Sequence, residues 1–473
     1  MPFRWNPKEQ FSLLTYLLKW TLMLCPVAFA IGSACAFFLY ALDMATQLRW
    51  REPWLLFLLP VAGLAIGCVY HWLGKPAEGG NNLIVEQIHE PGGGVPVRMA
   101  PLVLFGTLLT HLFGGSAGRE GTAVQMGGSI AGAFARIFKF NANGTPEQQR
   151  TLERTLLMAG VAAGFGAVFG TPLTGAIFAM EVLSLGGMNY RALFPCLFAS
   201  IVGDWSCSVW GIVHTSYHIT LGPAQRVDPW LLGKVALASI AFGAAGRLFA
   251  EMAHGFQFLY KKFIPSPVLR PAVGGMLVIA LVYLVGSRDY LGIGVTPPPL
   301  GLDGSRDFHG VCIVSAFHAG GAESWSWLLK IIFTCVTISS GFKGGEVTPL
   351  FFVGATLGNV LAILLNAPVD LFAGLGFVAV FAAAANTPLA CTIMGIELFG
   401  SRAEISSGYT VYFAVACVLA YLFSGHSGIY LSQKIGTPKI HSPEVEGDTS
   451  LRTARHATPS IFHRKGWKGP SGP

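Results

Sequence analysis

The feature that most constrains how this chain can fold is a charged motif that occurs twice, each time inside an apolar stretch rich in small residues. The sequence GREGTAVQMGGSIAG at 118–132 aligns with GGEVTPLFFVGATLG at 344–358. The alignment places Glu120 over Glu346. Ionisable groups at membrane depth are costly and usually functional, so both acids are candidates for a site.

A second pair of motifs follows the first, in the same order in both halves. TPLTGAIFAMEVL begins at Thr171 and TPLACTIMGIELF begins at Thr387, which places Glu181 over Glu397. We expect these two acids to accept hydrogen bonds from backbone amides at broken helices. An internally duplicated chain with Gly- and Pro-interrupted apolar segments indicates a transporter or channel whose site lies where the halves meet.

Composition assigns the chain to the polytopic membrane proteins. Of the 473 residues, 52% are hydrophobic and 12% are charged, whereas soluble domains carry about 25% charged residues. The net charge of +7 comes from basic residues at the ends and in loops, which favours cytoplasmic anchoring of both termini over nucleic-acid binding. The nine cysteines show neither a CxxC pair nor Cys/His spacing, so no disulfide framework or zinc site is indicated.

The apolar runs predict an all-α chain. A short half-helix is expected to start with Asn81 or Asn82 as its N-cap and to end before Pro91, and another helix is expected to restart near Thr122. The remaining helices are predicted at about 11–45, 54–72, 99–113, 152–185 with a break at 170–172, 192–210, 230–258, 273–285, 327–339, 349–365, 371–399 and 409–423.

These helices divide the chain into four parts. Residues 1–50 form a cytoplasmic N-terminal segment and the first long helix, and 51–212 form the first repeat. Residues 213–435 form the second repeat, and 436–473 are expected to be a polar, basic, disordered cytoplasmic tail.

Backbone that leaves helical conformation at membrane depth must line a cavity or be buried in protein. Its free N–H groups, at the positive end of a helix dipole, form an anion site. An anion is therefore the inferred substrate. Glu120 has two interpretations: it occupies the anion position and leaves it on protonation, or it only caps its own helix.

The motifs resemble those of the CLC chloride channel and antiporter family. The resemblance rests on GREG at 118–121, GGEVTP at 344–349, the two TPL…E helices and Tyr430. It implies an all-α fold of inverted repeats with broken and re-entrant helices, a homodimer with one pore per subunit, and Glu120 as the gating and proton-accepting glutamate. It also implies an anion site built from residues of four segments, namely Asn81, Gly118, Arg119, Gly121, Val347 and Tyr430.

Several departures resemble the fluoride-exporting CLC-F branch instead of the chloride type. Asn81 stands where chloride-type members carry a serine, and Thr122 where they carry proline. GGEVTP replaces GGIFAP, which adds Glu346 and Thr348. Glu181 is followed by Val182, so the second acid of chloride/proton antiporters is absent. The resemblance thus implies a fluoride/proton antiporter of the bacterial inner membrane.

Four residues keep more than one interpretation each. Glu346 relays protons, or it pairs with the dipole of its helix. Thr348 lines the path or, as the branch implies, contributes to a buried sodium site; alternatively it caps its own helix. Tyr430 points its hydroxyl at the ion or anchors at the interface. Arg119 attracts anions, forms a salt bridge or faces solvent.

Two rival functions remain. The first is a serine hydrolase, because Gly114–Gly118 fits GxSxG with Ser116 as nucleophile and His111 as base; however, this motif needs a strand before it, and none is predicted. The second is a passive anion channel, or a chloride/proton antiporter, of the same fold. The expected partners are fluoride or chloride, protons, membrane lipid and a second copy of the chain. No cofactor is expected beyond the sodium ion.

Overall fold

The computed structural model describes residues 7–140, 145–219, 227–296, 310–399, 407–439 and 449–457. Within these ranges the chain is almost entirely helical, and six helical stretches are long and apolar enough to cross a membrane. Helices of the first half are α1 (Pro7–Arg51), α2 (Leu59–Val69), α3 (Gly80–His89), α4 (Met99–Leu112), α5 (Glu120–Phe140), α6 (Pro146–Phe169), α7 (Pro172–Glu181) and α8 (Leu193–Val209).

The second half repeats this pattern of long and broken helices. They are α9 (Pro229–Phe263), α10 (Leu269–Val285), α11 (Ser326–Ser339), α12 (Val347–Leu365), α13 (Val369–Ala385), α14 (Pro388–Phe399) and α15 (Ser407–Phe423), followed by the short α16 (Leu451–Ala457). Every predicted helix is present. The all-α architecture with broken helices is therefore confirmed.

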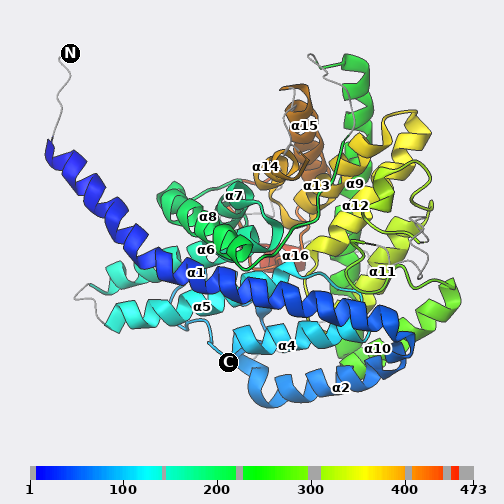
Figure 1. Cartoon of the computed structure of the whole chain (residues 1–473), viewed down its shortest axis with the longest axis horizontal. Coiled ribbons are helices and arrows are strands. Elements are labelled where there is room, and N and C mark those ends of the chain that lie inside the picture. Colours follow the sequence, from blue (N-terminus) through cyan, green and yellow to red (C-terminus); the bar gives the residue numbers. More distant parts are fainter. Residues whose placement is uncertain are drawn as a thin grey trace.

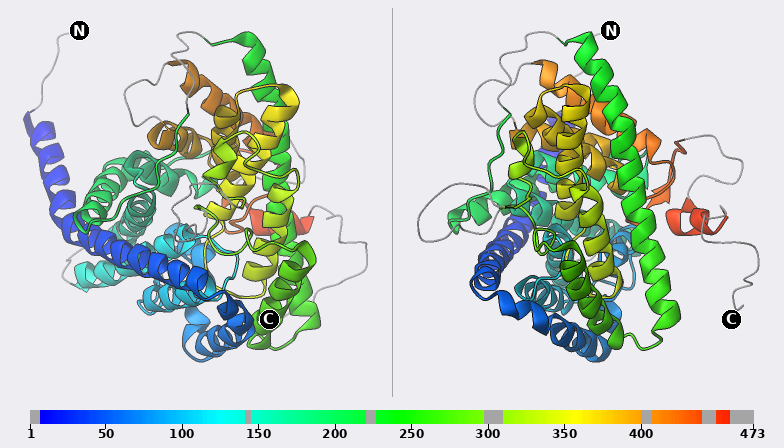
Figure 2. Two further views of the ribbon diagram at one scale, coloured as in Figure 1. Left: turned by 45° about the vertical axis from the view of Figure 1, so that its right-hand side comes forward. Right: turned by 90° about the vertical axis from the view of Figure 1, so that its right-hand side faces the viewer.

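The two halves lie side by side (Figure 1). The long α1 runs across the first half and packs on α4, α5, α6 and α8. The long α9 runs along the second half, where it packs on α13 and α15 (Figure 2). The halves meet where α2 packs on α10, α7 on α14 and α5 on α12.

The broken helices arise from the same local chemistry in both repeats. Helix α6 ends at Gly170, which adopts φ 71°, and Pro172 opens α7. Helix α13 ends at Asn386, with φ 59°, and Pro388 opens α14. Glycine and asparagine tolerate the left-handed conformation that ends a helix, and proline fits the first helical turn.

Each TPL motif is capped by the acid of the other repeat. Glu181 accepts hydrogen bonds from the N–H groups of Leu389 and Ala390, at 3.0 and 2.8 Å. Glu397 accepts from the N–H groups of Leu173 and Thr174, at 2.9 and 2.8 Å. The expectation that both acids bind backbone amides at broken helices is confirmed, and the partner in each case lies in the opposite half.

Three local predictions were wrong. The N-cap of α3 is Gly79, so Asn81 and Asn82 lie inside the helix and do not cap it. No side chain caps this helix start. The helix begins at two glycines, and Gly80 adopts φ 54°, a conformation that glycine tolerates. Helix α5 begins at Glu120, two residues before the predicted Thr122.

The third error concerns the tail, which is ordered over 449–457. Strand β3 (Thr449–Ser450) pairs with β2 (Lys434–Ile435), which in turn pairs with β1 (Ser184–Leu185). Leu451 is buried against the apolar residues of these strands. The contact joins segments far apart in the chain, so local composition did not reveal it. The rest of the tail beyond residue 457 lies outside the described residues.

Candidate functional site

The two charged motifs meet through a pair of backbone hydrogen bonds. The N–H of Gly118 donates to the carbonyl of Gly345 at 2.6 Å, and the N–H of Gly345 donates to the carbonyl of Gly118 at 2.7 Å. A Cβ added at Gly345 would lie 2.7 Å from the backbone nitrogen of Gly121. Glycine is therefore required for this approach, which brings the starts of α5 and α12 together.

Glu120, the first residue of α5, is fully buried and reaches across to α12. Its Oε2 accepts from the backbone N–H of Thr348 at 3.1 Å and from that of Arg119 at 3.1 Å. Its Oε1 accepts from the hydroxyl of Thr348. The carboxylate thus occupies the N-terminus of α12, the position at which helix geometry favours an anion.

Arg119 lies on the other side of the carboxylate. Its Nε is 3.6 Å from Oε1 of Glu120, and its side chain is partly exposed. Nε has no hydrogen-bond partner within the described part of the chain. Arg119 therefore forms an ion pair with Glu120 at the entrance to the site.

A small cavity of about 20 Å³ opens on this side of Glu120. Its lining combines the polar residues Arg119, Glu120, His214, Thr215, Tyr217 and Thr348 with apolar side chains. The rings of Phe351 and Phe377 in this lining are stacked 3.9 Å apart. The small volume of this outlet leaves the glutamate little water.

A large cavity of about 880 Å³ opens at the other end of the second motif. Gly344 and Glu346 line it, whereas Thr348, two residues further on, lines the small one. Asn81 and Tyr430 line the large cavity as well. Segment 344–348 therefore separates the two cavities, and Glu120 is hydrogen-bonded across it.

The polar groups around the large cavity have capacity for a ligand. A Cβ added at Gly121 would lie 3.0 Å from Nδ2 of Asn81, so this amide is next to the joined motifs. Oδ1 of Asn81 is buried and has no hydrogen-bond partner among the described residues. Glu346 is the N-cap residue of α12, but its side chain makes no capping hydrogen bond.

Not all of the predicted residues offer side-chain chemistry. Gly118 and Gly121 contribute by close backbone approach, and Val347 is a buried apolar residue at the start of α12. Thr348 does not cap its own helix, because its hydroxyl is bound to Glu120. Thr122 is also buried and pairs with the hydroxyl of Thr107 at 2.7 Å.

Two functional candidates were missed from the sequence. Gln125 lines the large cavity next to Gly80, and in the sequence it is a polar residue between the apolar Val124 and Met126. Lys343 lines the same cavity, with its amine 3.8 Å from the ring centre of Tyr70. The signal for Lys343 was its position directly before the GGEVTP motif.

Ser116 and His111 do not form the catalytic pair that a serine hydrolase requires. The hydroxyl of Ser116 hydrogen-bonds to Thr334 at 3.0 Å. Nε2 of His111 faces the carbonyl of Gly118 at 3.4 Å, and its Nδ1 has no partner within the described ranges. A nucleophile needs its base within hydrogen-bond reach, and Ser116 is bound elsewhere.

Comparisons with known proteins agree on one family. The model of a family described as voltage gated chloride channel matches residues 62–425. The chain is 48% identical, over 442 residues, to a chloride/fluoride channel protein of Pseudomonas syringae pv. tomato, covering 93% of this chain and 91% of the relative. It is 26% identical, over 315 residues, to the H(+)/Cl(-) exchange transporter ClcA of Vibrio cholerae, covering 64% of this chain and 62% of the relative.

Solved structures give the same picture. The crystal structure of a CLC-type fluoride/proton antiporter superposes with a TM-score of 0.77 at 31% identity, covering 91% of this chain and all (100%) of that one. A slow cyanobacterial Cl-/H+ antiporter superposes with a TM-score of 0.65 at 21% identity, covering 86% and 94% of the two chains. The second likeness bears on the fold alone.

Proposed function

Because the chain belongs to the voltage gated chloride channel (CLC) family of integral membrane proteins, we propose that it is an antiporter that exports fluoride in exchange for protons. The observation that carries the proposal is the position of Glu120. Its carboxylate binds the N–H and hydroxyl of Thr348 at the start of α12, between two cavities. An anionic side chain thus occupies a site that suits a small anion.

Proton exchange follows from the charge of this side chain. As a carboxylate, Glu120 uses the donors of Thr348 and blocks the path between the cavities. Protonation from the side of Arg119 makes the group neutral, which removes its charge-assisted hydrogen bonds and its ion pair. The neutral side chain then leaves, and a fluoride ion takes the same donors.

Glu346 provides the proton route on the opposite side in this proposal. It lines the large cavity with Tyr430 and Asn81, and it begins the same helix whose N-terminus binds Glu120. A proton leaving Glu120 has to cross only the segment between these two acids to reach water. We also propose that a sodium ion binds near the hydroxyl oxygen of Thr348, which lies in the segment between the two acids.

The choice of fluoride over chloride is supported by the neighbour at 31% identity, which is titled a fluoride/proton antiporter. The relative at 48% identity is named for both ions, as a chloride/fluoride channel protein. A small, strongly hydrated ion must regain hydrogen bonds when it loses its water. The Asn81 amide, beside Gly121, is placed to donate one.

The second candidate function is a passive anion channel, because the relative at 48% identity is named a channel protein. The chain is further proposed to work as a homodimer in the bacterial inner membrane, with both termini in the cytoplasm.

Selectivity is tested by loading liposomes that contain the pure protein with equal fluoride and chloride, and following both ions with electrodes. Faster fluoride efflux supports the proposal, whereas equal rates or faster chloride efflux would refute fluoride as the substrate.

A further inference from the structure

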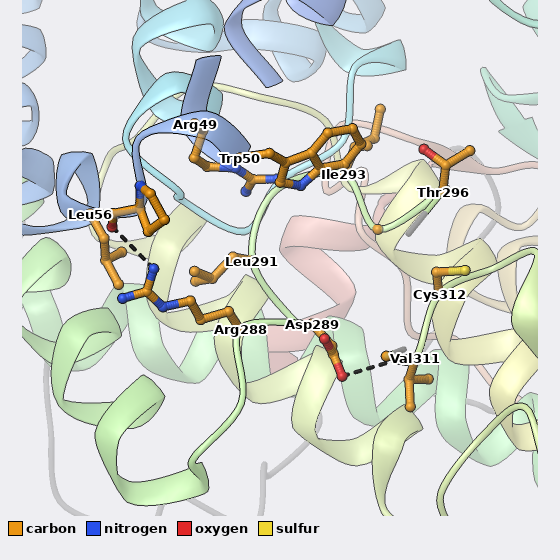
Figure 3. A pocket seen from close by; sticks show the side chains of 13 residues that line it. Arg49, Trp50, Leu56, Arg288, Asp289, Leu291, Ile293, Thr296, Val311 and Cys312 are labelled. Carbon is orange, nitrogen blue, oxygen red and sulfur yellow. Dashed lines mark hydrogen bonds between the residues drawn. The ribbon is translucent and has the colours of Figure 1, made fainter. Parts of the chain in front are cut away.

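A third cavity, of about 240 Å³, lies at the end of α1 remote from the N-terminus (Figure 3). The end of α1 contributes Arg49 and Trp50. Pro53 and Leu56 follow in the chain, the loop after α10 contributes residues between 288 and 296, and 310–312 complete the described lining. The cavity shares no lining residue with those around Glu120 and Glu346.

Arg49 is the residue in this lining whose charge has no partner. It makes no hydrogen bond or ion pair with any part of the chain that the structure describes, and its Nη1 is buried. The other charged groups are engaged, as Figure 3 shows: Arg288 donates to the carbonyl of Pro53 at 3.1 Å, and Asp289 accepts from the N–H of Val311 at 3.0 Å.

A fully buried cation lies directly behind the cavity wall. Lys330 is fully buried, and its amine donates to the carbonyls of Tyr290 and Gly292 at 3.1 and 2.9 Å. A Cβ added at Gly292 would lie 2.3 Å from Nη1 of Arg49. Arg49 and Lys330 therefore flank one glycine, and no ion pair neutralises either cation within the described residues.

A partly buried arginine beside a fully buried lysine is unfavourable unless an opposite charge lies near them. Asp289 is the one acid in the described lining, and its carboxylate is directed at Val311 and Gly310. The cavity in front of Arg49 has room for a small ion with part of its water. An anion there would supply the missing charge.

We propose that this cavity binds a small inorganic anion as the counter-ion of Arg49 and Lys330, at a site separate from the path through Glu120. The two sites are connected through one short segment. Gly294 and Thr296 line this cavity, and Val295 between them lines the small cavity of Glu120. An anion site at Arg49 therefore shares a wall with the small cavity of Glu120.

The test is the thermal unfolding of the full-length protein in lipid-free detergent, with sodium bromide replacing sodium gluconate at constant ionic strength. A ligand that binds the folded state raises the unfolding temperature, and we expect a shift of about 2 °C for the native chain at saturating bromide. Arg49→Gln should lose most of this shift. Arg51→Gln, which removes an exposed charge from the same helix end, should keep it.

A conservative variant controls for misfolding, and a diffraction measurement locates the site. Arg49→Lys retains a cation and should recover part of the bromide shift, and bromide should give an anomalous diffraction peak beside Arg49 that is absent from the Arg49→Gln protein. Equal shifts in the native and Arg49→Gln proteins, or anomalous peaks only near Glu120, would overturn the proposal. A shift produced by added phosphatidylglycerol but not by bromide would overturn it in favour of a lipid headgroup.

Discussion

Glu120 of the first repeat accepts hydrogen bonds from both the backbone N–H and the hydroxyl of Thr348 in the second repeat. The acid of one half therefore occupies the helix N-terminus of the other half. The equivalent threonines of the two motifs therefore have different partners: Thr122 pairs with Thr107, whereas Thr348 binds Glu120.

The hydroxyl of Thr348 should be essential for transport. Thr348→Val keeps the shape and removes one donor to a charged group, worth about 1.5–3 kcal/mol, which corresponds to a roughly 10- to 100-fold change. We expect fluoride efflux from liposomes to fall by this factor. Thr348→Ser retains the hydroxyl and is the matched control. Unchanged efflux in the valine variant would show that the hydroxyl serves neither the gate nor the anion.

The approach of the two motifs should not tolerate a side chain at Gly345. A methyl group there would lie 2.7 Å from the nitrogen of Gly121, so Gly345→Ala must push α5 and α12 apart. Loss of nearly all fluoride transport is expected from this variant. Gly255→Ala is the control, because a Cβ there meets nothing within 4 Å. Transport at the native rate by Gly345→Ala protein would contradict the observed contact.

Asn81 should set the preference for fluoride over chloride. Asn81→Ser installs the residue of the chloride type and removes an amide donor next to Gly121. A hydrogen bond to an anion is charge-assisted, but serine keeps one donor and chloride loses the same amide, so we expect a difference of about 1 kcal/mol, a factor of roughly five. The ratio of fluoride to chloride efflux should fall by about this factor. Asn82→Ser, on the neighbouring position of α3, should leave the ratio unchanged; a fall with Asn82 alone would assign selectivity to the wrong residue.

The reciprocal caps should stabilise the joined halves. Glu181→Ala leaves the N–H groups of Leu389 and Ala390 without their acceptor, at a cost of about 1–3 kcal/mol. Glu397→Ala does the same at Leu173 and Thr174. Both variants should unfold at lower temperature in detergent, whereas Glu147→Ala on the exposed start of α6 should change little. Native unfolding temperatures in both would mean that the caps contribute nothing.

The sequence predicted this fold well because its evidence was local and repeated. Apolar length located the helices, and Gly170 before the first TPL motif located one break, whereas the break at Asn386 within 371–399 was not assigned. The duplication also predicted that Glu120 and Glu346 lie near the same point. The joined glycines confirm that expectation.

What the sequence did not predict depends on contacts between distant segments. Capping of its own helix was the simplest of the interpretations open for Thr348, because a threonine near a helix start commonly caps it. Only the meeting of α5 with α12 revealed Glu120 as its partner. Likewise, Leu451 lies in a polar segment of the sequence, and its burial depends on packing against Ile435, which the local sequence does not indicate. Arg49 and Lys330 are 281 positions apart, and nothing local connects them.

The central claim is that Glu120 couples fluoride movement to protons. The most direct measurement imposes a pH gradient on proteoliposomes that hold equal fluoride on both sides, and follows fluoride with an electrode. The account predicts that the native protein drives fluoride uphill and that Glu120→Gln protein, tested at the same reconstituted amount, does not. Uphill fluoride movement by the Glu120→Gln protein, or none by the native protein, would contradict it.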